Sequence, residues 1–212
     1  MRRLLLLSVL LATNTAAFSR ALEDFERQLA RTPPVSTGFV EYRFSHLLKK
    51  PLRSSGTLEY RADGVLTRNV TSPHEEVTEV TGDEVRITRA NKPARTFSLE
   101  RAPQLRVLLG SFRALLDGHL TPLTRDFDVQ LTEQAPRWTL TLKPKDARLA
   151  RQLARINVFG ADQRPQCLEA LEPDGDGAVT LLEDAPARED KLPARSEVER
   201  ACHASGAPLA DH

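Results

Sequence analysis

Apolar and polar residues alternate with a period of two along most of this chain, a pattern that is typical of β-strands. The first run places Val40, Tyr42 and Phe44 at alternate positions, with polar side chains between them. Similar runs recur at spacings of about 8–12 residues, with turn residues such as Gly64 between them. The runs cover residues 39–46, 56–61, 65–71, 75–80, 85–89, 95–99, 127–131, 138–142, 155–159, 164–172 and 178–182. This succession predicts a meandering, strongly curved antiparallel sheet.

Three segments have helical spacing instead. Residues 18–31 repeat apolar side chains every three or four positions and end at Pro33 and Pro34, and residues 194–202 form a shorter candidate. The most regular helix lies in the middle of the chain and ends at Gly118, a residue suited to a helix C-terminus. Its apolar stripe consists of Leu105, Leu108, Leu109, Phe112, Leu115 and Leu116. A stripe of this width must be buried, so we predict that the helix covers the inner face of the sheet.

The predicted inner face admits two interpretations. Its apolar residues are Val40, Tyr42, Phe44, Leu58, Tyr60, Leu66, Val85, Ile87, Phe97, Trp138 and Leu140. They form either an ordinary core or a groove that takes an acyl chain, with the mid-chain helix as a movable lid. Apolar contact is non-directional and each buried methylene contributes about 0.8 kcal/mol, so an acyl chain can replace a lid helix.

The N-terminus has the parts of an export signal. Arg2 and Arg3 precede an apolar run over residues 4–12, and Thr15 and Ala17 occupy the positions that signal peptidase recognises. We therefore predict a signal peptide over residues 1–17, cleaved before Phe18, and a periplasmic mature protein. The alternative is the buried first helix of a cytosolic protein. No cysteine follows the apolar run, so a lipid anchor would have no attachment residue.

Length and charge limit the classes of partner. Removal of residues 1–17 changes the formal net charge from +1 to −1, and this balance gives no attraction to nucleic acid or to an anionic membrane. We expect a monomer with one domain over residues 18–184 and a polar C-terminal tail over residues 185–212. Lys49 and Lys50 are interpreted as solvated turn charges.

Cys167 and Cys202 are the two cysteines of the chain. In an oxidising compartment they predict one disulfide that ties the tail to the body, with two free thiols as the alternative. On the chain-entropy model such a bridge stabilises the fold by roughly 3–4 kcal/mol.

No catalytic motif emerges from the sequence. The five histidines are scattered, without the spacing of a metal-binding pair. Asp174-Gly175-Asp176-Gly177 resembles the start of a calcium loop but lacks its distal glutamate, and a tight turn is the simpler interpretation. We therefore predict no enzymatic activity, no metal and no cofactor.

Several sequence blocks share their order and spacing with a known family. They are Phe39–Tyr60, with the motif Leu47-Leu48-Lys49-Lys50-Pro51-Leu52-x-Ser54-Ser55-Gly56-x-Leu58-x-Tyr60, then Leu66–Arg89, Phe112–Gly118, Trp138–Leu149, Ile156–Gly160 and Glu172–Asp176. In this order the chain resembles the periplasmic outer-membrane lipoprotein carriers, the LolA family. It resembles more closely the LolA-related carriers that are encoded beside exporters and lipid or polyene assembly enzymes.

The resemblance implies an α+β fold in which an unclosed β-barrel, as in LolA and LolB, is covered by helices. It also implies a carrier without enzymatic activity. Such a carrier takes an acylated cargo from an inner-membrane exporter and yields it to an outer-membrane acceptor.

Two departures from the family pattern bear on the cargo. In lipoprotein carriers an arginine on the second strand locks the lid by hydrogen bonding, but Ala62 occupies that position here, and Arg61 or Arg68 are the candidates to replace it. The strands also carry fewer aromatic residues. A glycolipid or another acylated product therefore suits the chain as well as a lipoprotein does, and a periplasmic module that senses lipids or lipoproteins is the alternative function.

Overall fold

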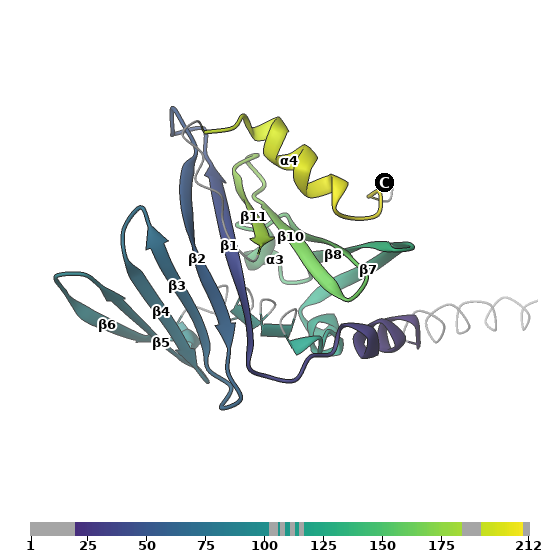
Figure 1. The fold of residues 1–212 in the computed structure, drawn as a ribbon, viewed down its shortest axis with the longest axis horizontal. Helices are drawn as coiled ribbons and strands as arrows, with labels where there is room; N and C mark the ends of the chain where they lie inside the picture. Colours follow the sequence, from purple (N-terminus) through teal and green to yellow (C-terminus); the bar gives the residue numbers. More distant parts are fainter. Residues whose placement is uncertain are drawn as a thin grey trace, which may run out of the picture.

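The sheet of the computed structural model is one continuous antiparallel unit. Its eleven strands lie in the order β6-β5-β4-β3-β2-β1-β11-β10-β9-β8-β7 (Figure 1). The edge strands β6 and β7 do not pair with each other, so the curved sheet is not closed. The structure describes residues 20–101, 106, 109–110, 113–114, 117–183 and 192–209. The predicted fold class is confirmed, whereas the predicted signal peptide lies outside the described residues.

Each of the eleven predicted runs overlaps one strand. The strands are β1 (Val35–Phe44), β2 (Leu52–Tyr60), β3 (Leu66–Ser72), β4 (Glu76–Thr81), β5 (Glu84–Arg89), β6 (Lys92–Ser98), β7 (Phe127–Gln134), β8 (Arg137–Pro144), β9 (Arg155–Ala161), β10 (Arg164–Leu171) and β11 (Gly177–Glu183). The short helices are η1 (Leu99–Arg101), η2 (Thr121–Arg125), α3 (Ala147–Ala150) and α4 (Arg195–Ala204). Residues 20–29 form the N-terminal helix, and residues 106, 109–110, 113–114 and 117 belong to the mid-chain helix.

The largest core cluster lies between the N-terminal helix and strands β7–β10. Phe25 of the helix contacts Trp138 edge to face, with ring centroids 4.9 Å apart. Leu22 and Leu29 join the same cluster, which continues across β8 and β9. We call this side of the sheet the inner face, because both the N-terminal helix and the mid-chain helix pack on it.

Gly118 ends the mid-chain helix, as predicted. Its φ angle is +77°, and a Cβ atom there would lie 2.6 Å from the backbone of Ala30. A left-handed backbone and so close an approach both require glycine. The glycine therefore lets the end of the mid-chain helix meet the end of the N-terminal helix.

The outer face of the sheet, opposite to the inner one, is covered by α4. Val198 and Cys202 of this helix pack against the side chains of β1, β10 and β11. The predicted disulfide is confirmed, since Cys167 on β10 is bonded to Cys202 on α4 with their Cα atoms 5.4 Å apart. Residues 192–209 of the predicted tail are thus packed on the sheet.

Replacing both cysteines by alanine should destabilise the protein. The bridge spans 35 residues, and its loss frees that loop in the unfolded chain at a cost of roughly 3–4 kcal/mol. Urea unfolding under oxidising conditions measures the difference in free energy. Wild-type protein unfolded with reductant present is the matched control and should approach the double variant, whereas equal midpoints for oxidised wild type and variant would contradict the prediction.

Candidate functional site

The strand register divides the predicted groove residues between two faces. Directly paired residues on neighbouring strands share a face. Leu58 pairs with Thr37, so it lies on the same face as Phe39, whereas Val40 pairs with Ser55 on the opposite face. The prediction that Val40, Tyr42 and Phe44 share one face with the other groove residues is therefore wrong. All three lie beneath α4 on the outer face, packed with Val179 and Val198.

This error has a physical cause. Alternation shows which residues of a strand share a face, but it does not show which face meets the groove. Both faces of β1 are buried, because α4 covers the outer one and Phe39 packs with Leu58 and Val70 on the inner one. The apolar side of residues 194–202, together with Cys202, was the sequence signal for a second covered face.

Trp138 and Leu140 lie on the inner face, but the N-terminal helix already fills the space above them. Their side chains are 2% and 0% exposed and belong to the largest core cluster. The indole Nε1 of Trp138 also donates a hydrogen bond to the carbonyl of Asp162 at 3.0 Å. In this structure these two residues are core rather than free groove lining.

Six of the predicted groove residues lie on the inner face of β2, β3, β5 and β6, and Val80 of β4 connects them into one apolar surface. Adjacent strands bring them together through direct pairs, such as Tyr60 with Leu66 and Val85 with Phe97. Ile87 and Phe97 are only partly buried. We call this set the apolar strip: Leu58, Tyr60, Leu66, Val85, Ile87 and Phe97.

The mid-chain helix lies against this strip. Leu109 packs with the cluster that contains most of the strip's residues. The Arg113 guanidinium lies 5.2 Å from the centre of the Tyr60 ring, and Arg106 forms an ion pair of 3.1 Å with Asp83 in the β4–β5 turn. The other predicted lid residues lie outside the described residues: Leu105, Leu108, Phe112, Leu115 and Leu116.

Two clefts border the mid-chain helix. The larger has a volume of about 610 Å³ and the smaller about 170 Å³, and Arg106, Gly110 and Arg113 line both. The larger cleft is also lined by Arg31, Pro33, Tyr60, Ala114, Asp117, His119, Pro122, Leu123, Arg125 and Asp126. A helix bordered by open space is less tightly held there than one inside a filled core.

The two candidate lid-locking arginines have different environments. Arg61 lies in the β2–β3 turn and donates hydrogen bonds of 3.2 and 2.6 Å to the carboxylate of Asp63. Arg68 lies on the inner face, where its Nη2 donates to Glu41 and Ser54 at 3.2 Å and its guanidinium lies over the Phe39 ring. Glu41, Ser54 and Phe39 all lie on β1 and β2, so the lid-locking role of Arg68 stays a prediction.

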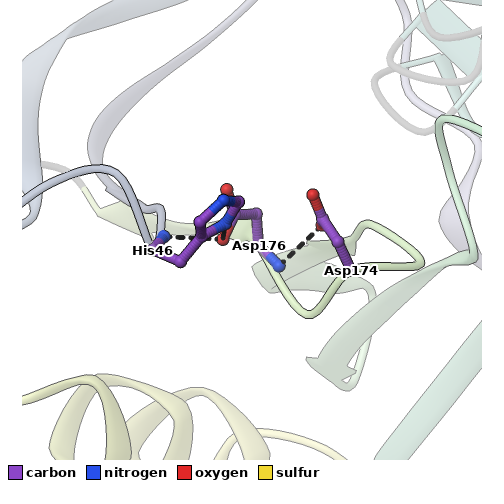
Figure 2. A group of neighbouring side chains, drawn as sticks. All are labelled: His46, Asp174 and Asp176. Atoms are coloured by element: carbon purple, nitrogen blue, oxygen red, sulfur yellow. Dashed lines mark hydrogen bonds and ion pairs between the residues drawn. The ribbon is translucent and has the colours of Figure 1, made fainter.

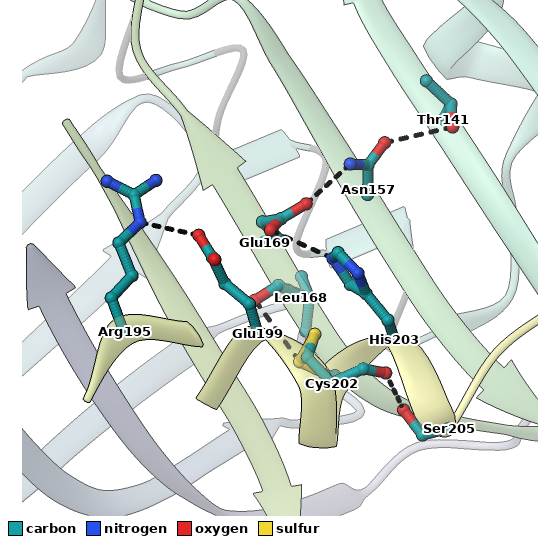
Figure 3. A network of polar contacts seen from close by, with 10 residues as sticks. Thr141, Asn157, Leu168, Glu169, Arg195, Glu199, Cys202, His203 and Ser205 are labelled. Carbon is teal, nitrogen blue, oxygen red and sulfur yellow. Dashed lines mark hydrogen bonds and ion pairs between the residues drawn. A yellow bond between two sulfur atoms is a disulfide. The ribbon is translucent and has the colours of Figure 1, made fainter. Parts of the chain in front are cut away.

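The outer face contains a buried polar network beneath α4 (Figure 3). The Glu169 side chain accepts hydrogen bonds from Asn157 at 2.8 Å and from His203 at 3.2 Å. Asn157, fully buried, accepts in turn from Thr141 at 3.1 Å. The network joins β8, β9 and β10 to α4. Its residue on α4, His203, directly follows the disulfide-bonded Cys202.

The Glu169–His203 contact shifts both acid dissociation constants. The hydrogen bond to Glu169 raises the pKa of His203 above 6.5. Burial alone would raise the pKa of Glu169, but the hydrogen bonds from His203 and Asn157 outweigh it, so this pKa lies below 4.5. The pair therefore stabilises the fold fully between pH 4.5 and pH 6.5, which are the ordinary pKa values of the two side chains in an unfolded chain. The stabilisation is lost as the pH rises through the raised pKa of His203 or falls through the lowered pKa of Glu169.

Replacing His203 by glutamine should flatten the pH dependence of stability. Wild-type protein should have a lower urea midpoint at about pH 8 than at about pH 6, because His203 loses its proton over this interval. The variant should show a smaller difference, the remainder arising from His46, whose pKa is also raised by hydrogen bonding to Asp176. His74→Gln, at an exposed position, is the control and should keep the wild-type slope. An unchanged slope in His203→Gln would refute the prediction.

His46, Asp174 and Asp176 lie together just after the end of β1 and just before the start of β11 (Figure 2). Their ligand atoms lie within 4.8 Å of one another, the arrangement of a potential metal site. However, Asp176 Oδ1 accepts hydrogen bonds from both the backbone and the ring of His46, and Asp174 caps the backbone N–H of Asp176. These bonds form the tight turn that the sequence predicts, and they fix the base of the β1–β2 loop.

Asp176 stays ionised over the whole physiological range. A hydrogen bond from Ser45, with those from His46, lowers its pKa to about 2 although the residue is 8% exposed. The loop after β1 is therefore anchored at any pH at which the protein is expected to work.

A model of the family described as outer membrane lipoprotein carrier protein LolA-like matches residues 15–205. The chain belongs to this family. The match includes the strands, the mid-chain helix and α4. No curated protein matches the chain significantly.

Solved structures give weaker likenesses. A LolA superfamily protein from Nitrosomonas europaea is 10% identical, with 82% of this chain and 94% of that chain covered and a TM-score of 0.41. The complex of MucA and MucB from Pseudomonas aeruginosa contains a match of 14% identity, covering 84% and 62%, with a TM-score of 0.40. The complex of the CwlD amidase from Clostridioides difficile with the GerS lipoprotein contains one of 13% identity, covering 80% and 95%, with a TM-score of 0.43.

Proposed function

We propose that this protein is a periplasmic carrier that binds an acylated cargo between the apolar strip and the mid-chain helix. The cargo is a lipoprotein or a glycolipid. In this proposal the protein is exported by its signal peptide, takes the cargo from an inner-membrane exporter and yields it to an outer-membrane acceptor. Membership of the LolA-like family and the arrangement of the inner face support it.

The observation that carries the proposal is an apolar strip, with residues on four of the strands β2–β6, beneath a helix that is bordered by two clefts. The N-terminal helix fills the inner face of β7–β10 with close packing, but Ile87 and Phe97 on the other half are only partly buried. An acyl chain entering here replaces contacts of the helix with equivalent contacts of its own. The exchange is favourable because each additional buried methylene contributes about 0.8 kcal/mol.

The larger cleft suits the polar part of such a cargo. It opens beside Tyr60, at the end of the strip, and its lining includes Arg31, Arg113 and Arg125. Arginine side chains donate several hydrogen bonds in a fixed geometry to phosphate and carboxylate groups. An acylated molecule can thus place its chain on the strip and its headgroup in the cleft.

We propose no catalytic role for the residues of the apolar strip or of the mid-chain helix. A carrier needs a reversible apolar site and a cover that moves, and both are accounted for by the strip and the helix. A sensor of lipids or lipoproteins on the same fold would also bind an acyl chain. It would differ by binding a second protein when loaded.

Replacing Leu109 by arginine should weaken retention of an acyl ligand. A charged side chain cannot pack on the apolar strip, so we expect release of a fluorescent fatty-acyl probe to be faster by at least about tenfold. Stopped-flow dilution of preloaded protein measures the rate. Leu109→Met preserves an apolar side chain at the same position and should stay within about twofold of wild type.

Native mass spectrometry of protein purified from the periplasm tests directly whether the protein binds an acyl ligand. Wild-type protein should carry an acyl ligand, and Leu109→Arg should carry less. A wild-type mass without ligand under gentle conditions, together with no binding of the fluorescent probe, would overturn the proposed function.

Replacing Asp83 by asparagine should speed ligand uptake. The Arg106–Asp83 pair ties the mid-chain helix to the β4–β5 turn, and exposed pairs of this kind contribute about 0–1 kcal/mol, so uptake should increase up to about fivefold. Asp63→Asn is a matched control, because the Arg61–Asp63 pair is similarly exposed but lies within the β2–β3 turn. Equal effects of the two variants would show that the helix does not move as a lid.

A further inference from the structure

The exposed large apolar side chains of the described residues gather in one loop. Across the part of the chain that the structure describes, the exposed large apolar residues are Leu47, Leu48 and Leu52, at 82%, 38% and 57%. All three lie in or beside the loop between β1 and β2. Single exposed leucines are ordinary on protein surfaces, but a cluster of them marks an interaction surface.

The same loop is locally cationic. Lys49 and Lys50 lie between the leucines and are exposed, and Arg53 follows them at the start of β2. No aspartate or glutamate occurs from Ser45 to Arg53. Among the described residues neither lysine forms an ion pair. The loop therefore presents two exposed lysines, while the carboxylates of Asp174 and Asp176 lie at its base beside His46.

Backbone hydrogen bonds hold the first part of the loop. The backbone N–H of Leu48 donates to the carbonyl of Ser45 at 3.0 Å, and that of His46 donates to Asp176 at 2.8 Å. Figure 1 shows this loop protruding at the end of the two long strands β1 and β2, at the top of the view. A flat surface can thus reach its tip.

We propose that this loop docks the protein on a bilayer of anionic phospholipids, with Leu47, Leu48 and Leu52 in the interfacial layer and Lys49 and Lys50 against the phosphates. Leucine beside lysine suits an interface, because the apolar side chains enter the acyl region while the ammonium groups stay at the headgroups. The proposal is independent of the acyl groove and would hold for any cargo.

The composition of the loop favours a bilayer over a protein partner. Protein interfaces are enriched in aromatic residues and depleted in lysine, whereas the segment from Ser45 to Arg53 contains two lysines and no aromatic residue except the imidazole of His46. A fluid apolar layer beneath a layer of phosphates accepts such a tip without shape complementarity.

Vesicle flotation of the mature protein tests the proposal. Wild-type protein should float with vesicles of phosphatidylglycerol and phosphatidylethanolamine, and much less with phosphatidylcholine vesicles. Lys49→Gln/Lys50→Gln should weaken binding by about fivefold per lysine and remove most of its salt dependence. Lys92→Gln/Lys143→Gln removes two exposed lysines elsewhere and should bind as wild type does.

The apolar contribution is tested at the same positions. Leu47→Ser/Leu52→Ser should reduce binding by at least about tenfold, and Leu47→Met/Leu52→Met should retain it. These side chains are exposed, so the variants should unfold at the wild-type temperature and bind the fluorescent acyl probe normally. That result separates failure of this proposal from failure of the acyl groove.

Tryptophan fluorescence gives a direct reading of insertion. Trp138 is the single tryptophan of the chain and is 2% exposed, so its emission should not change with vesicles. Leu47→Trp should shift to shorter wavelength and be quenched by brominated lipids, whereas Lys92→Trp should not.

Three results would overturn the proposal: no flotation of wild type at low salt, equal flotation of the serine and methionine pairs, or an unshifted Leu47→Trp emission. Loss of a protein partner in the serine variant without any loss of vesicle binding would likewise assign the loop to a protein interface instead.

Discussion

The antiparallel pairing of β1 with β11 joins the two halves of the sheet, and the positions of the helices depend on it. Phe39 pairs with Leu182 on the inner face, and Tyr42 pairs with Val179 on the outer face. The pairing of these two strands therefore determines which of their residues lie on each face of the sheet. Glu41 and Thr180, whose side chains are hydrogen bonded across this pair, are 139 residues apart in sequence. Such a distant contact is formed against a large loop-closure entropy, so the buried residues on both faces must stabilise it together.

The two faces of the sheet are covered in physically different ways. On the outer face, α4 is held by a disulfide and by the hydrogen bond between His203 and buried Glu169. On the inner face of β2–β6, the described contacts of the mid-chain helix are the packing of Leu109, the Arg113–Tyr60 contact and the exposed Arg106–Asp83 pair. A covalently fixed cover on one side preserves the sheet while non-directional contacts on the other side are exchanged.

Much of this fold could be predicted from the sequence, because alternation along a half-buried strand and turn residues such as Gly64 are local signals. The helix end at Gly118 could be predicted for the same reason, whereas the disulfide could be predicted because the chain has two cysteines that can pair only with each other. The face on which Val40, Tyr42 and Phe44 lie could not, since it depends on a helix that returns from the far end of the chain. Arg113 over Tyr60 was also missed, because a cation–π contact between distant elements leaves no local pattern. Lys49 and Lys50 were correctly predicted to be exposed, but the exposure of the leucines beside them follows only from the structure.

The missing pair between β6 and β7 has a consequence for what the protein can enclose. In a closed barrel the number of strands and their shear fix the diameter, so the interior has one size. Here β6 and β7 are two separate, unpaired edges of the sheet. Lys92, Pro93 and Arg95 protect the β6 edge from pairing with another strand. The circumference is therefore not set by hydrogen bonds. A small change of twist along the sheet can adjust the interior to contents of different thickness without breaking a single strand pair.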